Sequence, residues 1–313
     1  MKNELLLRIS KAIEFLCRMQ KPDGSFISAF IKGKQSAEET KILYHLQAAS
    51  LLYSCHKLLD QAYIKTAADK ATEYIESYVF EHNNESCIIY NGESYGYWNA
   101  LLGLIYMKRQ SGNYAPLIES IAKCFRDGKV VAQYIDGTQP AKFKNTMRGP
   151  VGAFVIAYLK SRRITDAIHA ANHIMNSQRL DYLDTWALRL IYDELENDNI
   201  RVSLRNEYRN RSHVYIQMTS NIDVGMLTSY AAATTNQSLL SWVDIYPEVT
   251  GKCQELLNRQ ILFQPLDTFG GAFIQSDKTP DIRIEYIIHN TTVFLEYLIR
   301  IEQDQAISPE KIF

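Results

Sequence analysis

The sequence lacks a long apolar run and an excess of either charge. Its first residues, MKNELLLRISKAIEF, carry Glu4, Arg8 and Lys11 among the leucines and isoleucines, so neither a signal peptide nor a membrane span is predicted. The 34 basic residues nearly balance the 35 acidic ones. No overall field therefore attracts nucleic acid, while peripheral contact with a membrane surface stays open.

Paired cysteines and the common cofactor motifs are also absent. The five cysteines are isolated, with no CxxC spacing: Cys17, Cys55, Cys87, Cys124 and Cys253. This pattern is typical of a reduced cytoplasm, and neither disulfides nor a thiolate zinc site is expected. No GxxxxGK[ST], GxGxxG or GxSxG occurs, so nucleotide-loop and serine-hydrolase chemistry is not indicated. We expect no cofactor.

The chain has a helical pattern along most of its length. With 313 residues, 46% apolar and 22% charged, it can form one large core, and we predict a single domain over residues 1–313. Apolar residues recur at helical spacing, and two-residue alternation is scarce. About twelve helices are predicted, with starts near Asn3, Ser36, Tyr63, Tyr95, Tyr114, Gly149, Thr165, Asp181, Ile200, Asp223, Pro247 and Arg283.

These predicted helices alternate in character. The fourth, YGYWNALLGLIYM, and the sixth, GPVGAFVIAYL, are apolar or small on nearly every face, whereas the third, YIKTAADKATEYIESYV, keeps a charged face. Inner and outer helices that alternate six times predict an all-α (α/α)6 toroid. The loops into the even helices are the longer ones. The loops at 82–94 and 130–148 contain short β-like pieces, and we expect the long loops to gather at one mouth.

Capping patterns support several of these helix starts. Ser36 with Glu39, Asp181 with Asp184, and Ser220 with Asp223 follow the capping-box spacing, with Asp allowed in place of Glu. Acidic residues are predicted at four inner-helix starts and would then surround the mouth: Glu38 with Glu39, Asp184, Asp223 and Glu285.

One short stretch has the spacing of a known repeat. In EFLCRMQKPDGSF, Phe15 and Leu16 are followed by Gln20, Gly24 and Phe26. This resembles the QW repeat of the squalene and terpene cyclase and protein prenyltransferase superfamily, whose members are α/α toroids. The resemblance implies that the glutamine ties a helix end to the next helix start, and Gly24 can adopt the positive φ that reverses the chain. An ordinary turn at Pro22–Gly24 is the other interpretation. A looser copy places Gln264 before Gly270, Gly271 and Phe273.

A second motif bears on chemistry. The segment DYLDTWAL resembles the DxDDT-like motif of type II terpene cyclases, in which the middle aspartate protonates an alkene or epoxide. Here Leu183 stands at that middle position, so the resemblance leaves Asp184 or Asp181 to serve as the acid. Both residues also fit plain helix capping. A carboxylic acid buried beside Trp186 would have its pKa raised by loss of water, as a general acid needs.

Two further groups are candidate site residues. Glu285 and His289 lie four apart on the last predicted helix, where they form either a catalytic pair or a buried polar cluster that closes the ring. The second group lies at the starts of the fourth and sixth helices and consists of Tyr95, Tyr97, Trp98, Asn99 and Arg148. Its aromatic rings could stabilise a carbocation, stack on a sugar or only contribute to packing.

Two patterns are interpreted as outer-surface features. His169 and His173 have a zinc-compatible spacing, but no glutamate follows the first histidine as in HExxH, so no metal site is predicted. Arg201, Arg205 and Arg209 form a basic stripe whose expected role is pairing with nearby acids in solvent, although an acidic partner stays open.

The function hypothesis follows from the resemblance and the acids. We expect an enzyme similar to terpenoid cyclases, with Asp184 or Asp181 as acid, acting on an isoprenoid or another apolar small molecule. The predicted binding residues are Tyr95, Tyr97, Trp98, Asn99, Arg148, Trp186 and Asp223. Carbohydrate-active (α/α)6 enzymes, namely glycoside hydrolases, lyases and uronate epimerases, are the first alternative. A toroid that only binds a lipid or a peptide is the second.

Overall fold

The structure divides the chain into two compact units. The first comprises Met1–Lys21, Phe26–Glu39 and Leu204–Phe313, and the second comprises Pro22–Ser25 and Thr40–Ser203. The computed structural model describes residues 2–82, 85–92, 94–109, 114–126, 129–130, 132–133, 143–144, 151–175, 184, 187, 191, 258, 260–261, 269–276 and 279–306.

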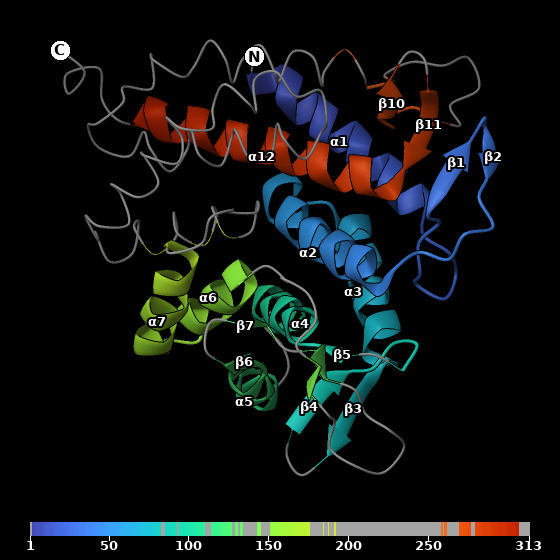
Figure 1. The fold of residues 1–313 in the computed structure, drawn as a ribbon. Helices are drawn as coiled ribbons and strands as arrows, with labels where there is room; N and C mark the ends of the chain where they lie inside the picture. Colours follow the sequence, from blue (N-terminus) through green and yellow to red (C-terminus); the bar gives the residue numbers. More distant parts are fainter. Residues whose placement is uncertain are drawn as a thin grey trace. The chain divides into compact units, whose positions relative to one another are not determined.

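The described part of the second unit contains three helical hairpins (Figure 1). Their helices are α2 (Ile42–Leu59) with α3 (Ala62–Glu76), α4 (Gly96–Arg109) with α5 (Ala115–Cys124), and α6 (Val151–Lys160) with α7 (Ile164–Met175). Helix α4 also packs against both α2 and α6, so the even helices lie side by side. This arrangement matches the predicted alternation of inner and outer helices in this part of the chain.

Burial along these helices follows the same alternation. Every residue from Gly152 to Leu159 of α6 is buried, because nearly all of its side chains are apolar or small. Helix α3 instead buries one stripe, which includes Ile64, Ala68 and Ile75, and keeps Lys65 exposed. The core of the unit therefore lies along the inner helices.

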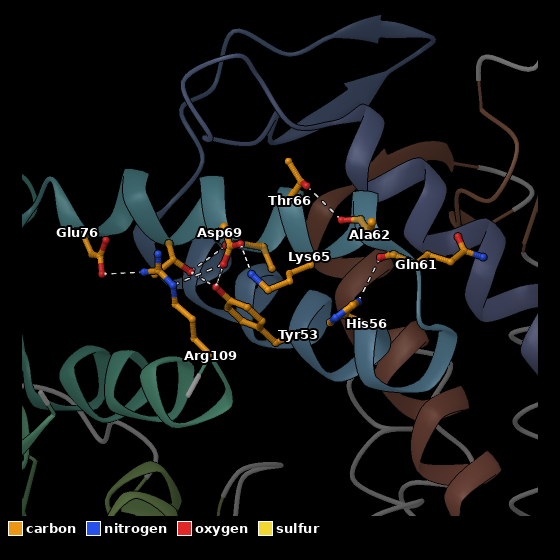
Figure 2. Close-up of polar contacts among 11 residues, drawn as sticks. Tyr53, His56, Gln61, Ala62, Lys65, Thr66, Asp69, Glu76 and Arg109 are labelled. Atoms are coloured by element: carbon orange, nitrogen blue, oxygen red, sulfur yellow. Dashed lines mark hydrogen bonds and ion pairs between the residues drawn. The ribbon is translucent and has the colours of Figure 1, made fainter. Parts of the chain in front are cut away.

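A polar network joins three of these helices (Figure 2). Asp69 of α3 accepts hydrogen bonds from the Tyr53 hydroxyl of α2 at 2.6 Å and from Lys65 Nζ at 2.7 Å. Arg109, in the last turn of α4, lies 3.5 Å from Asp69 Oδ1 and donates to Glu76 Oε1 at 3.3 Å. The network therefore couples the first hairpin to the second.

The first unit packs helix α1 (Lys2–Arg18) against α12 (Ile284–Ala306). An antiparallel sheet of order β10-β11-β1-β2 precedes α12, and its strands are β10 (Ile274–Ser276), β11 (Thr279–Arg283), β1 (Ala29–Ile31) and β2 (Lys34–Gln35). Phe30 of β1 pairs with Ile282 on one side and with Gln35 on the other. The Ile284 amide donates to the Ser28 carbonyl at 2.9 Å. This hydrogen bond extends the pairing of β1 with β11 to the first residue of α12.

Short strands also occupy the loops of the second unit. β3 (Val79–His82) pairs with β4 (Glu85–Ile88), β6 (Phe125–Arg126) pairs with β7 (Lys129–Val130), and β5 (Ser94–Tyr95) pairs with β8 (Ala132–Gln133), which pairs with β9 (Phe143–Lys144). Short strands in the loops at 82–94 and 130–148 are thus confirmed. Those in the loops at 26–35 and 274–283 were not predicted.

The helix starts predicted near Asn3, Tyr63, Tyr95, Tyr114, Gly149, Thr165 and Arg283 are confirmed within two residues. Those near Ile200, Asp223 and Pro247 lie outside the described residues, as does Asp181, although Asp184 is helical. Among the helices of the described part, none is long and apolar enough to cross a membrane.

The start predicted near Ser36 is wrong. The Ser36 amide donates to the Ala29 carbonyl at 2.8 Å, as a continuation of the β1–β2 pairing, and Ser36 Oγ accepts the Glu38 amide instead of that of Glu39. Helix α2 begins only at Ile42, with no side-chain cap. Glu38 and Glu39 are therefore exposed loop residues and not buried acids at an inner-helix start.

Two glycine turns share one geometry. Gly24 has a φ of +89°, in the positive range that the sequence predicts, and Gly271 has a φ of +96°. A β-bridge joins Gln20 to Phe26 around the first glycine, and another joins Gln260 to Phe273 around the second. Gln264, the glutamine singled out in the sequence, lies outside the described residues.

These turns press against helix backbones. A Cβ at Gly24 would lie 2.2 Å from the carbonyl oxygen of Lys70 in α3, and one at Gly271 would lie 1.9 Å from that of Lys11 in α1. Gln260 Nε2 also donates to the Arg8 carbonyl of α1 at 2.8 Å. Each glycine therefore allows a close approach that no other residue permits.

Candidate functional site

Aromatic rings cluster at the start of α4. Tyr95 closes strand β5, where it pairs with Ala132, and the helix begins at the next residue. The Tyr95 ring meets the Trp98 ring edge to face at 4.6 Å, and the Tyr97 ring lies 6.0 Å from that of Trp98. Trp98 is only 7% exposed. The structure thus brings together three of the four aromatic residues that the sequence predicted as binding residues.

Asn99, the fourth predicted binding residue of this helix start, has a structural contact. Its Oδ1 accepts the amide of Ile88 at 2.9 Å, which ties β4 to α4, and the side chain is fully buried. No hydrogen-bond partner of Nδ2 is found among the described residues. One side of this amide therefore holds the fold and the other is still available for a polar contact.

The carboxyl of Asp184 lies at the start of α6. Its Oδ1 accepts the amide of Gly152 at 2.7 Å, and the side chain is 8% exposed. Asp184 therefore caps a helix, as the sequence allowed, but the helix is α6 and not the one predicted to start at Asp181.

The loops before α4 and α6 are connected by a sheet. Strand β5 lies immediately before α4, and its partner β8 and the following β9 belong to the connection that leads into α6. Backbone hydrogen bonds thus hold these two loops side by side. Since α4 and α6 also pack against each other, the aromatic cluster and Asp184 are positioned by neighbouring inner helices.

A second cluster of titratable groups was not predicted. His45, in the first turns of α2, is 1% exposed, and its ring meets the Tyr74 ring edge to face at 4.8 Å. The hydroxyls of Tyr74 and Tyr78 are 3.1 Å apart, and the Tyr78 ring lies 5.0 Å from that of Tyr90. Burial, together with the hydrogen bond to Tyr78, raises the pKa of Tyr74.

The sequence contained a weak signal for this cluster. Tyr74 and Tyr78 lie four apart and so share one face of α3 near its end. Nothing in the sequence marks His45, because its partner Tyr74 comes from the next helix.

His289 and Glu285 lie on α12 in the first unit. Burial lowers the pKa of His289, and the charge of Glu285 offsets part of this effect. The Nδ1 atom of His289 is buried and has no hydrogen-bond partner among the described residues. That His289 shares a pocket with Asp184 stays a prediction, since the two residues belong to different units.

The remaining predicted site residues lie outside the described residues. They are Asp181, Trp186, Arg148 and Asp223, together with the stripe of Arg201, Arg205 and Arg209.

Comparisons with known proteins support the fold. No family model and no curated protein matches the chain. Solved structures match it at low identity, and they include the following three. D-mannose isomerase has a TM-score of 0.69 and 11% identity over 96% of this chain and 98% of its own. Cellobiose 2-epimerase from Spirochaeta thermophila DSM 6192 has a TM-score of 0.69 and 12% identity over 97% of each chain. Type II terpene cyclase MstE from Scytonema has a TM-score of 0.64 and 12% identity over 96% of this chain and 99% of its own.

The chain resembles (α/α)6 toroid enzymes in fold. Terpene cyclases are among them, so the expected resemblance is confirmed at the level of fold. The same fold carries isomerases and epimerases of sugars, and it therefore leaves the chemistry to the site residues. The count of twelve helices stays a prediction.

Proposed function

We propose that this chain is an enzyme that protonates an isoprenoid or similarly apolar substrate and so starts its cyclisation, with Asp184 as the acid. The observation that carries the proposal is the burial of this carboxyl. Among the side chains that the structure describes, no other aspartate or glutamate is buried to the same degree. A carboxylic acid can protonate a weakly basic alkene only where water does not compete for its proton.

The proton transfer is written for the carboxyl of Asp184 in its acid form. Oδ1 accepts the Gly152 amide, which holds the carboxyl in place. The O–H bond breaks as the π electrons of the alkene form a new C–H bond, and a carbocation remains on the substrate. Attack by the next double bond closes a ring, and loss of a proton ends the reaction. The product is then an isomer of the substrate, and the carboxylate regains a proton.

The aromatic cluster suits the cationic intermediate. The faces of Trp98 and Tyr95 can stabilise a carbocation by cation–π attraction, while the rings exclude water. A variant of type II terpene cyclase MstE, determined in complex with geranylgeranyl dihydroxybenzoate, has a TM-score of 0.60 and 12% identity over 95% of this chain. This neighbour supports a polyprenyl group as the first substrate class to test.

The test compares the wild type with Asp184→Asn on a panel of polyprenyl compounds of increasing length. Mass spectrometry coupled to chromatography detects cyclic isomers of unchanged mass. Asparagine keeps an oxygen that accepts the Gly152 amide but has no acidic proton, so turnover should fall by roughly a hundredfold to ten-thousandfold. Asp60→Asn, at an exposed loop position, is the matched control and should leave turnover unchanged. Equal turnover of Asp184→Asn and wild type would refute the acid assignment.

A second candidate function rests on His45 and Tyr74. A buried imidazole against a tyrosine whose hydroxyl is hydrogen-bonded to Tyr78 could move a proton next to a sugar carbonyl. In that step His45 removes the proton from the carbon next to the carbonyl, and the C–H electrons form an enediolate. Return of the proton to the other face of the same carbon gives an epimer. Return to the former carbonyl carbon gives an isomer, with one proton moving from the neighbouring hydroxyl to the former carbonyl oxygen. D-mannose isomerase and cellobiose 2-epimerase, which share the fold, make aldoses and disaccharides the panel to test.

The two candidates give opposite variant patterns. Sugar isomerisation would be followed by NMR as the exchange of a carbon-bound proton for solvent deuterium. His45→Gln and Tyr74→Phe should abolish that exchange, and Asp184→Asn should not. If neither panel yields turnover while one of them yields binding, the non-enzymatic binding function is supported instead.

A further inference from the structure

The two histidines on α7 converge at their ring nitrogens. His169 and His173 are four residues apart, and their Nε2 atoms lie 3.4 Å from each other, with ring centroids 4.9 Å apart. His169 is exposed and His173 is half-buried, so water and solutes reach the pair. The rings come from consecutive turns of a well-formed helix, which holds their separation nearly constant.

The distance between the nitrogens is long for a hydrogen bond. A good hydrogen bond from a ring N–H spans about 2.7 to 3.2 Å between heavy atoms. The edge of a tetrahedron around zinc, with zinc–nitrogen bonds of about 2.0 to 2.1 Å, measures about 3.3 to 3.4 Å. Two cis ligands of a square-planar metal would lie closer together, at about 2.8 to 3.0 Å. The separation therefore fits a tetrahedral ion.

We propose that His169 and His173 bind one zinc ion at the exposed surface of α7. This inference is independent of the proposed function, and it differs from the sequence-based expectation because the spacing alone gave no distance between the nitrogens. No group of three or more metal-binding side chains occurs in the described part of the chain. The two remaining positions of a tetrahedral ion can be taken by water.

Bound zinc should stabilise α7. The ion links two consecutive turns of the helix and binds the folded state in preference to the unfolded one, so the stability gained depends on the zinc concentration. The thermal midpoint of the wild type should therefore rise as zinc is added.

The experiment titrates zinc chloride into the full chain, without a histidine tag, by isothermal calorimetry, with thermal unfolding in parallel. We expect one zinc per chain. His169→Gln and His173→Gln should each weaken zinc binding about tenfold or more and abolish the zinc-dependent rise in midpoint. Glutamine is a good helix former at these positions, so both variants should fold.

His56→Ala is the matched control, because His56 is another histidine with an accessible ring, at the end of α2. It should bind zinc like the wild type. The proposal is overturned if the two glutamine variants keep wild-type zinc affinity, or if His56→Ala loses it to the same extent. Circular dichroism of each variant without zinc establishes that α7 is still helical.

Discussion

The hydroxyl of Tyr53 donates a hydrogen bond of 2.6 Å to Oδ1 of Asp69, and so joins α2 to α3 (Figure 2). Lys65 holds the other carboxylate oxygen at 2.7 Å. Because Arg109 of α4 approaches the same carboxylate, one aspartate connects two helical hairpins. The stability of this part of the fold should therefore depend on Asp69 and its partners.

Tyr53→Phe should lower the free energy of unfolding by about 1 kcal/mol, because it removes the hydroxyl and leaves the ring in place. Urea denaturation followed by circular dichroism measures the change. Tyr114→Phe, at a position 36% exposed, makes the same chemical change and should have almost no effect. Equal effects of the two substitutions would contradict the importance assigned to the Tyr53–Asp69 bond.

Asp69 should also make stability depend on pH. Burial raises its pKa, but the hydrogen bonds from Lys65 and Tyr53 outweigh this and hold the pKa below its ordinary value. A carboxyl whose pKa is lower in the folded than in the unfolded state stabilises the protein at pH values above its unfolded pKa, which is about 3.9. This stabilisation is lost as the pH falls through the lower pKa of the folded state.

The matching experiment compares wild type and Asp69→Asn in urea at several pH values. The variant should be less stable at pH 7, and the difference should shrink as the pH falls from about 5 toward 3. Asp60→Asn serves as an exposed control with no such trend. A difference that is the same at pH 3 and pH 7 would show that ionisation of Asp69 is irrelevant.

Alanine at either turn glycine should be strongly destabilising. At Gly24 and Gly271 the substitution adds a positive-φ strain of about 1 to 2 kcal/mol and a collision with a helix carbonyl of about 1 to 3 kcal/mol. Gly33 separates the two effects, because its φ is also positive, at +76°, but a Cβ there meets nothing within 4 Å. Urea midpoints should thus fall slightly for Gly33→Ala and much further for the other two. Similar losses at all three positions would rule out the close approach as the cause.

Cys17 should be unreactive in the folded protein. Burial is the main cause that raises the pKa of its thiol, to about 12, so its thiolate is scarce at neutral pH. Alkylation at pH 8, followed by mass spectrometry of the Cys17 peptide, should be at least about a hundredfold slower in the native chain than in urea. Labelling at the same rate in both states would show that the thiol is accessible and ionisable.

The sequence predicted the parts of the structure that depend on local patterns. The apolar content of α6 foretold its complete burial, and Gly24 between turn formers foretold a positive φ. The capping pattern at Ser36 predicted a helix start that does not form, because the Ser36 backbone pairs with Ala29 instead. Strand β11 was missed for a related reason, since its partner β1 lies far away in the sequence.

The contacts of the candidate site also divide into local ones, which the sequence could predict, and ones between distant residues, which it could not. The ring contacts of Tyr95 and Trp98 follow from spacing within one helix start, so the sequence could group them. His45 and Tyr74 come from different helices, and only the packing of α2 on α3 brings them together. The Gly152–Asp184 bond likewise links residues from separate segments, and no motif encodes it.

The pairing of Ala29 with Arg283 sets an order on synthesis. Strand β1 leaves the ribosome long before β11 and the helix that follows it. Until then the edge of β1 that faces β11 and the face of α1 that packs on α12 lack these two partners. Until β11 and α12 have been made, the growing chain therefore exposes an unpaired strand edge and an apolar helix face, which are the features that make nascent chains prone to aggregation.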